Sequence, residues 1–166
     1  MIRETEKRLP PGAACAVLFV HGILGSPAQF APFLPLVPQD WSFCNLLLQG
    51  HGGGARDFSA ASMAVWREQA RQAFAELRAQ HETVVIAAHS MGTLFAVQEA
   101  VRSPVEGLFL LNVPLNVHVR PRALRNAWLN YGGTPRDPWG RAAVTAYGVE
   151  RDRNVLHYAG WPPRFF

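Results

Sequence analysis

The sequence is poor in cysteine, and the two that it has stand far apart. Cys15 and Cys44 are the only cysteines among 166 residues. The chain therefore has neither the ligand spacing of a zinc site nor the dense pattern of a disulfide scaffold. Each cysteine falls near the start of a predicted strand. We expect two buried free thiols, no metal ion and no other cofactor.

Long apolar runs are also missing. No run approaches the length of a membrane span, so we expect no integral membrane segment. Residues 1–8 mix both charge signs and contain no apolar stretch before Pro10 and Pro11. This pattern is unlike a secretory signal peptide, and we expect a cytoplasmic protein.

Charge is sparse and scattered. Charged residues make up 17% of the chain and the formal net charge is +4. The basic residues form no cluster interleaved with stacking aromatics, so no nucleic-acid partner is expected. With 49% hydrophobic residues, the composition predicts a single globular domain over residues 1–166 and does not fix its oligomeric state.

A sharp break in the hydrophobic pattern is centred on Ser90. An apolar run over residues 84–88 is followed by His89, Ser90, Met91 and Gly92, and then by a helical pattern. This order predicts a strand, a tight turn and a helix, the context of a nucleophile elbow. Such an elbow is usually spelled G-x-S-x-G, and here Ala88 replaces the first glycine. We interpret Ser90 as a catalytic nucleophile, the alternative being a structural turn serine.

Two further motifs precede the elbow. Residues 17–26 read Val-Leu-Phe-Val-His-Gly-Ile-Leu-Gly-Ser, a buried strand that ends in His-Gly, and residues 49–52 read Gln-Gly-His-Gly. In this order the three motifs resemble the α/β-hydrolase family, in particular its carboxylesterase and monoacylglycerol-lipase branch. The resemblance covers roughly residues 13 to 113. It implies that the backbone N–H groups of Ile23 and Met91 form an oxyanion hole.

Strands and helices alternate along the chain, which predicts an α/β fold with a parallel sheet flanked by helices. We expect strands at 15–20, 42–48, 83–88 and 106–113, and helices at 60–80 and 91–102. The sheet and its helices would occupy residues 13–114. Residues 115–166 would form a cap-like helical segment, as the resemblance implies.

Two regions next to these elements are less regular. Residues 1–13 are a charged lead that is too short for a convincing hairpin. Residues 26–37 are rich in proline and are expected to form one short helix with Pro27 first, packing Phe30, Phe33 and Leu34. On the helix after the elbow, Phe95 and Val97 are expected in the core.

The catalytic base and acid are harder to find. In the family the order is serine, then an acid, then a histidine. After Ser90, Asp152 and His157 are in that order, but neither follows a predicted strand. Of the other histidines, His118 precedes both aspartates, and His21, His51 and His89 sit where the family has no base. We expect the chain to lack its C-terminal strands, with the acid and the histidine beyond residue 166.

The sequence therefore predicts a serine hydrolase that acts on small-molecule carboxylic esters through an acyl-Ser90 intermediate, inactive as this fragment. Thioesterase, peptidase and acyltransferase chemistry are not separated from esterase chemistry at this level. The alternative is a non-catalytic α/β-hydrolase-like module that binds a small apolar ligand or a partner protein.

Overall fold

The computed structural model describes residues 4–52, 57, 58 and 60–116. Its strands are β1 (Glu6–Arg8), β2 (Cys15–Val20), β3 (Ser42–Leu46), β4 (Thr83–His89) and β5 (Gly107–Leu111). Its helices are α2 (Met63–Arg78) and α3 (Met91–Arg102), with 3-10 turns η1 (Pro27–Gln29) and η2 (Leu34–Leu36) between β2 and β3. The strands predicted at 15–20, 42–48, 83–88 and 106–113 and the helices predicted at 60–80 and 91–102 are present, with bounds that differ by a few residues.

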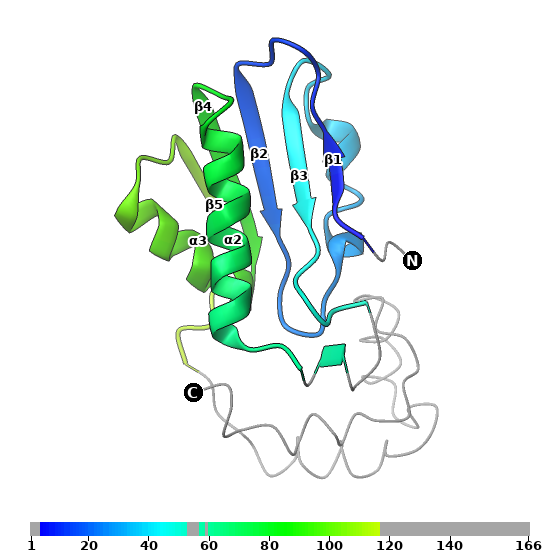
Figure 1. Cartoon of the computed structure of the whole chain (residues 1–166), viewed down its shortest axis with the longest axis vertical. Coiled ribbons are helices and arrows are strands. Elements are labelled where there is room, and N and C mark those ends of the chain that lie inside the picture. The colour runs from blue at the N-terminus through cyan, green and yellow to red at the C-terminus, as the bar shows by residue number, and fades with distance from the viewer. Residues whose placement is uncertain (1–3, 53–56, 59, 117–166) are drawn as a thin grey trace, which may run out of the picture.

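The strands form one sheet in the order β1-β3-β2-β4-β5 (Figure 1). The β2–β3, β2–β4 and β4–β5 pairs are parallel, and β1 runs antiparallel to β3. Parallel neighbours require crossover connections. The segment with η1 and η2 connects β2 to β3, α2 leads from β3 to β4, and α3 connects β4 to β5. The predicted α/β class is confirmed, and the arrangement matches part of an α/β-hydrolase fold.

Strand β1 lies in the charged lead, where no convincing strand is predicted. Long-range contacts of its basic residues fix it. The Arg8 guanidinium lies 5.0 Å from the ring centroid of Phe43 and donates to the carbonyl of Trp41. Lys7 Nζ contacts Glu76 on α2 at 3.0 Å. Contacts over such separations leave no trace in a local pattern.

Helices α2 and α3 cover one face of the sheet (Figure 1). The predicted stripe of α2 is buried there, including Trp66, Phe74 and Leu77. On α3, Phe95 is buried as expected, but Val97 is 40% exposed and that expectation is wrong. Val97 faces away from α2 and the sheet, on a side that nothing within the described residues covers.

On the opposite face, the segment that carries η1 and η2 packs against β2 and β3, and this cluster also includes Ala87 of β4. The single predicted helix is replaced there by two 3-10 turns, because prolines recur along the segment and cannot donate helical hydrogen bonds. Pro27 begins η1 as expected, Phe30 is buried, and Phe33 is 47% exposed, contrary to expectation. Phe109 of β5, on this same face, is 63% exposed.

The cysteines lie on neighbouring strands, β2 and β3, and form no disulfide. Cys44 is buried at the centre of β3, and burial raises the pKa of its thiol to about 11. Cys15 is only half-buried, contrary to the expectation that both thiols are covered. It begins its strand at the edge of the core, where packing from the helices ends.

Candidate active site

The carboxyl ends of β2 and β4 meet at the centre of the sheet. From β2 the chain turns to β3 on one side, and from β4 it turns to β5 on the other. In open α/β sheets such a switch point leaves a crevice in which ligands bind. The loop after β2 carries Gly22 and Ile23, and the turn after β4 carries Ser90. The sheet order therefore brings the two main sequence motifs to one place.

Ser90 stands at the junction of β4 and α3 with a strained backbone. Its φ of 51° and ψ of −120° lie in a backbone region that residues with a Cβ rarely adopt. The turn is held from both sides. The Ser90 N–H donates to the Leu111 carbonyl at 2.8 Å. The Thr93 N–H and hydroxyl both donate to the Ser90 carbonyl, at 2.9 and 2.6 Å.

The small residues around Ser90 are required by close packing. A Cβ added at Gly92 would lie 2.3 Å from the Val20 carbonyl oxygen and 2.7 Å from that of His21. No side chain fits there, because both obstacles are backbone atoms of β2 and its loop. Ala88 is completely buried. The strand, tight turn and helix predicted around Ser90 are therefore present.

The loop after β2 lies directly against Ser90. A Cβ added at Gly22 would meet both the Ser90 Cβ and the His89 Nδ1 at 3.0 Å. The Gly25 N–H donates to the Gly22 carbonyl at 3.0 Å, which closes a turn with Leu24 at a φ of 57°. Within the part of the chain that the structure describes, the N–H groups of Ile23 and Met91 donate to no acceptor. Met91 follows Ser90 directly, and Ile23 follows Gly22, which lies against Ser90.

His21 is a buried structural histidine. The Leu48 N–H donates to its Nε2 at 3.1 Å, which places the ring proton on Nδ1, and Nδ1–H donates to the Gly22 carbonyl at 2.8 Å. Burial lowers the pKa of His21 to about 4. The ring is therefore neutral at pH 7 and ties the loop after β2 to the loop after β3.

His51 fills an aromatic cluster beneath the same loops. Its ring centroid lies 4.7 Å from those of His21 and Phe58 and 4.9 Å from that of Trp66. Burial, and then the neighbouring His21, lower the pKa of His51 to about 3. Such a ring packs as an aromatic side chain and is not placed to take a proton from Ser90.

His89 points toward the end of β5. Its Nε2 lies 3.1 Å from the Asn112 Nδ2, and burial lowers its pKa. Asn112 has a φ of 53°, a left-handed conformation that asparagine tolerates better than most residues. No local pattern in the sequence marks Asn112, because its partner His89 lies 23 positions away. Among the described residues, the side-chain hydrogen bond to Ser90 comes from Thr93 and goes to the Ser90 carbonyl, not to its hydroxyl.

The other predicted site residues, Asp152 and His157, lie outside the described residues, as does the cap-like segment apart from its first two residues. Among residues 4–52, 57, 58 and 60–116, no three potential metal ligands gather in one place. In the same part of the chain, no helix is both long and apolar enough to cross a membrane.

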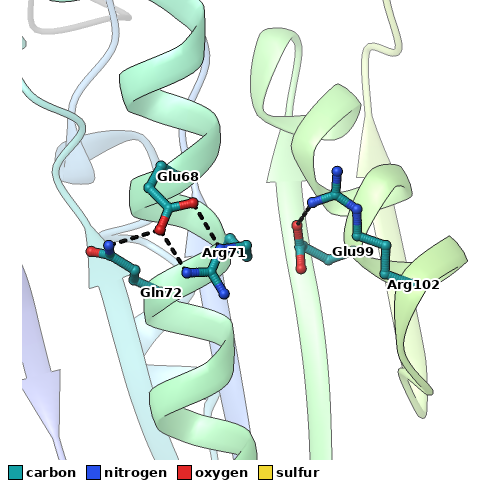
Figure 2. Close-up of polar contacts among 5 residues, drawn as sticks. All are labelled: Glu68, Arg71, Gln72, Glu99 and Arg102. Carbon is teal, nitrogen blue, oxygen red and sulfur yellow. Dashed lines mark hydrogen bonds and ion pairs between the residues drawn. The ribbon is translucent and has the colours of Figure 1, made fainter.

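A groove of about 370 Å³ lies between the C-terminal halves of α2 and α3. Arginines line it, but each is paired with a carboxylate. Arg71 contacts Glu68 at 2.6 Å and Arg102 contacts the buried Glu99 at 3.4 Å (Figure 2). Arg78 contacts Glu106 at 2.9 Å. These pairings neutralise the groove, which therefore offers no excess positive charge to an anion.

Solved structures with a similar fold include enzymes of several kinds. One comes from a study of LipS and LipT, two metagenome-derived lipolytic enzymes; the TM-score is 0.64 and the identity 21%, over 82% of this chain and 54% of that one. MenH from S. aureus gives a TM-score of 0.61 and 11% identity, over 95% of this chain and 70% of that one. A thioesterase domain from the curacin biosynthetic pathway gives 0.54 and 22%, over 76% and 48%.

The chain thus spans about half the length of two of these structures, and identities this low establish the fold alone. No curated protein matches the sequence. The family model described as "Alpha/beta hydrolase family" matches residues 17–166, which is most of the chain. Together with the sheet order and the elbow at Ser90, this match identifies the chain as a member of the α/β-hydrolase family.

Proposed function

We propose that this chain carries the nucleophile and the oxyanion hole of a serine hydrolase that acts on small-molecule carboxylic esters. The observation that carries the proposal is the strained Ser90 at the β4–α3 junction, with the Gly22 loop packed against its Cβ. Backbone strain of this kind costs stability and is typically kept where a side chain must be presented for a reaction.

In this mechanism Ser90 Oγ attacks the ester carbonyl while a general base takes its proton. The carbonyl oxygen becomes an oxyanion and accepts hydrogen bonds from the N–H groups of Ile23 and Met91. The alcohol then leaves with the proton, and acyl-Ser90 remains. A water molecule, activated by the same base, releases the acid and restores the hydroxyl.

The base and its orienting acid must come from outside the described residues. His21 and His51 are neutral and buried, and His89 is directed toward Asn112. We propose that a histidine and a carboxylate follow the described part of the chain, with Asp152 and His157 as the candidates within residue 166. Phe109 on β5 is exposed, and we expect further structure to pack there and bring these residues toward Ser90.

Labelling with a fluorophosphonate tests this proposal. The complete protein should acquire one adduct, and peptide mass spectrometry should place it on Ser90. Ser90→Ala should abolish the adduct, while Ser103→Ala, at the far end of α3, should leave it unchanged. If the complete protein remains unlabelled while a known serine hydrolase reacts, Ser90 is not a working nucleophile.

The alternative is a non-catalytic module that binds a small apolar ligand or a partner protein. One observation favours it, because no described group is placed to deprotonate Ser90. Repeating the labelling on the 166-residue chain and on the complete protein separates the cases. Labelling of the complete protein alone would place the base after residue 166, and labelling of neither would favour the module.

A further inference from the structure

The turn that carries Ile23 is built around the side chain of Gln29. The Gly22 N–H donates to Gln29 Oε1 at 3.2 Å. At the other end of the turn, a Cβ added at Gly25 would lie 2.8 Å from the Gln29 amide atoms. The amide therefore contacts both ends of the Gly22–Gly25 turn and fills the space inside it.

Gln29 is itself held in place by the rest of η1. The Ser26 hydroxyl accepts a hydrogen bond from the Ala28 N–H at 3.3 Å and caps the turn. Asn45, completely buried on β3, donates from Nδ2 to the Pro27 carbonyl at 2.9 Å. The next residue, Phe30, is buried in the core. Gln29 is thus anchored to the centre of the sheet and not to a free loop.

The hydrogen bond from Gly22 to Gln29 holds the start of the turn that carries Ile23. The two N–H groups that follow in the turn, those of Ile23 and Leu24, donate to no acceptor among the described residues. Because Gly22 packs against Ser90, a shift of the turn also moves the Ile23 N–H relative to the Ser90 hydroxyl. Oxyanion donors act only when they are fixed in place before the charge develops.

We propose that Gln29 is a positioning residue that fixes the Ile23 N–H as an oxyanion donor. This inference rests on the proposed function, since it needs Ser90 to be the nucleophile. Gln29 suits the role because its amide is uncharged and accepts the Gly22 hydrogen bond without placing a negative charge beside the developing oxyanion. Gln29 belongs to none of the three sequence motifs, and no local pattern marks it.

The test is Gln29→Met in the complete protein, because methionine has a similar length but accepts no comparable hydrogen bond. The matched control is Gln72→Met on α2, which removes an exposed hydrogen bond to Glu68. We expect Gln29→Met to lower kcat for ester hydrolysis by about 10- to 100-fold, with KM within about twofold, since a misplaced donor mainly affects the transition state. The control should retain wild-type values.

A second readout separates positioning from a general loss of structure. A trifluoromethyl ketone adds to the serine and forms an oxyanion, so its affinity should fall in parallel with kcat. The affinity for an unreactive alcohol analogue of the same size should stay unchanged. Gly25→Ala provides a second variant, because its methyl group would displace only the flexible end of Gln29. If Gln29→Met does not fold, Gly25→Ala takes its place, and it should also lower kcat.

The inference is overturned if Gln29→Met matches Gln72→Met in kcat and in trifluoromethyl ketone affinity, or if only KM changes. Its failure is distinct from failure of the proposed function. If only the inference on Gln29 fails, the wild-type protein hydrolyses the ester and Ser90→Ala does not. If the proposed function fails, the wild-type protein itself is inactive, or Ser90→Ala retains activity.

Discussion

Replacing Ser90 by glycine should stabilise the protein relative to replacing it by alanine. Both variants lack the hydroxyl, so their difference isolates the cost of holding a Cβ at a φ of 51° and a ψ of −120°. Glycine adopts this backbone conformation without a steric penalty. The hydrogen bonds from the Ser90 N–H to Leu111 and from Thr93 to the Ser90 carbonyl remain in both variants.

The magnitude follows from three contributions. Relief of strain at such a position is worth about 2 kcal/mol. Glycine gains more freedom in the unfolded chain, which opposes this by about 0.7 kcal/mol. The loss of a half-buried methyl group against Gly22 opposes it by about 0.4 kcal/mol. Ser90→Gly should therefore exceed Ser90→Ala by about 1 kcal/mol in the free energy of unfolding.

Equilibrium unfolding in urea at pH 7 measures this difference, and a thermal scan should give a midpoint higher by about 2–4 °C for a domain of this size. Equal m-values in the two variants are needed for the comparison to hold. A Ser90→Gly variant less stable than Ser90→Ala would refute the reasoning. The backbone at Ser90 would then be unstrained, and its geometry would not support Ser90 as a nucleophile.

Three other outcomes follow from the structure. Gly92→Ala should lower the free energy of unfolding by about 2–3 kcal/mol, because its methyl group meets backbone oxygen of β2; a loss under about 0.5 kcal/mol in urea would mean that α3 sits farther from β2. Because burial lowers the pKa values of His21 and His51 to about 4 and about 3, the unfolded chain binds more protons below about pH 6.5. Stability should fall there by on the order of 1 kcal/mol per pH unit for each histidine, and unfolding of His51→Phe should show a shallower pH dependence. Asn112→Ala should be less stable than Asn112→Gly, because both lose the contact with His89 but only alanine is strained at a φ of 53°; equal urea midpoints would contradict this.

The parts of the fold that the sequence predicts well are those set by local pattern. The run before Ser90 is apolar on both faces, as is typical of a central parallel strand, so the strand and its end are visible in the sequence, although in the structure only one of its faces is fully buried. The stripe on α2 is equally clear. Strand β1 is missed because Arg8 and Lys7 hold it through contacts with Phe43 and Glu76, far away in sequence.

The candidate site divides in the same way. Ser90 and the small residues around it follow from a motif whose spacing is dictated by close backbone packing. Gln29 and Asn112 do not, because each acts through one hydrogen bond whose partner is chosen by the tertiary fold. The exposure of Val97 could not be predicted either, since an apolar residue on a helix signals burial without saying which element supplies the cover.

The buried thiol of Cys44 can report how often the sheet opens around β3. A raised pKa and a position at the centre of β3 protect it from alkylating reagents on two grounds, since it is both inaccessible and almost entirely protonated at neutral pH. Cys15, half-buried, should react first and can be replaced. The rate at which a reagent then modifies Cys44 would report how often β3 separates from its neighbours β1 and β2, without any added dye or label.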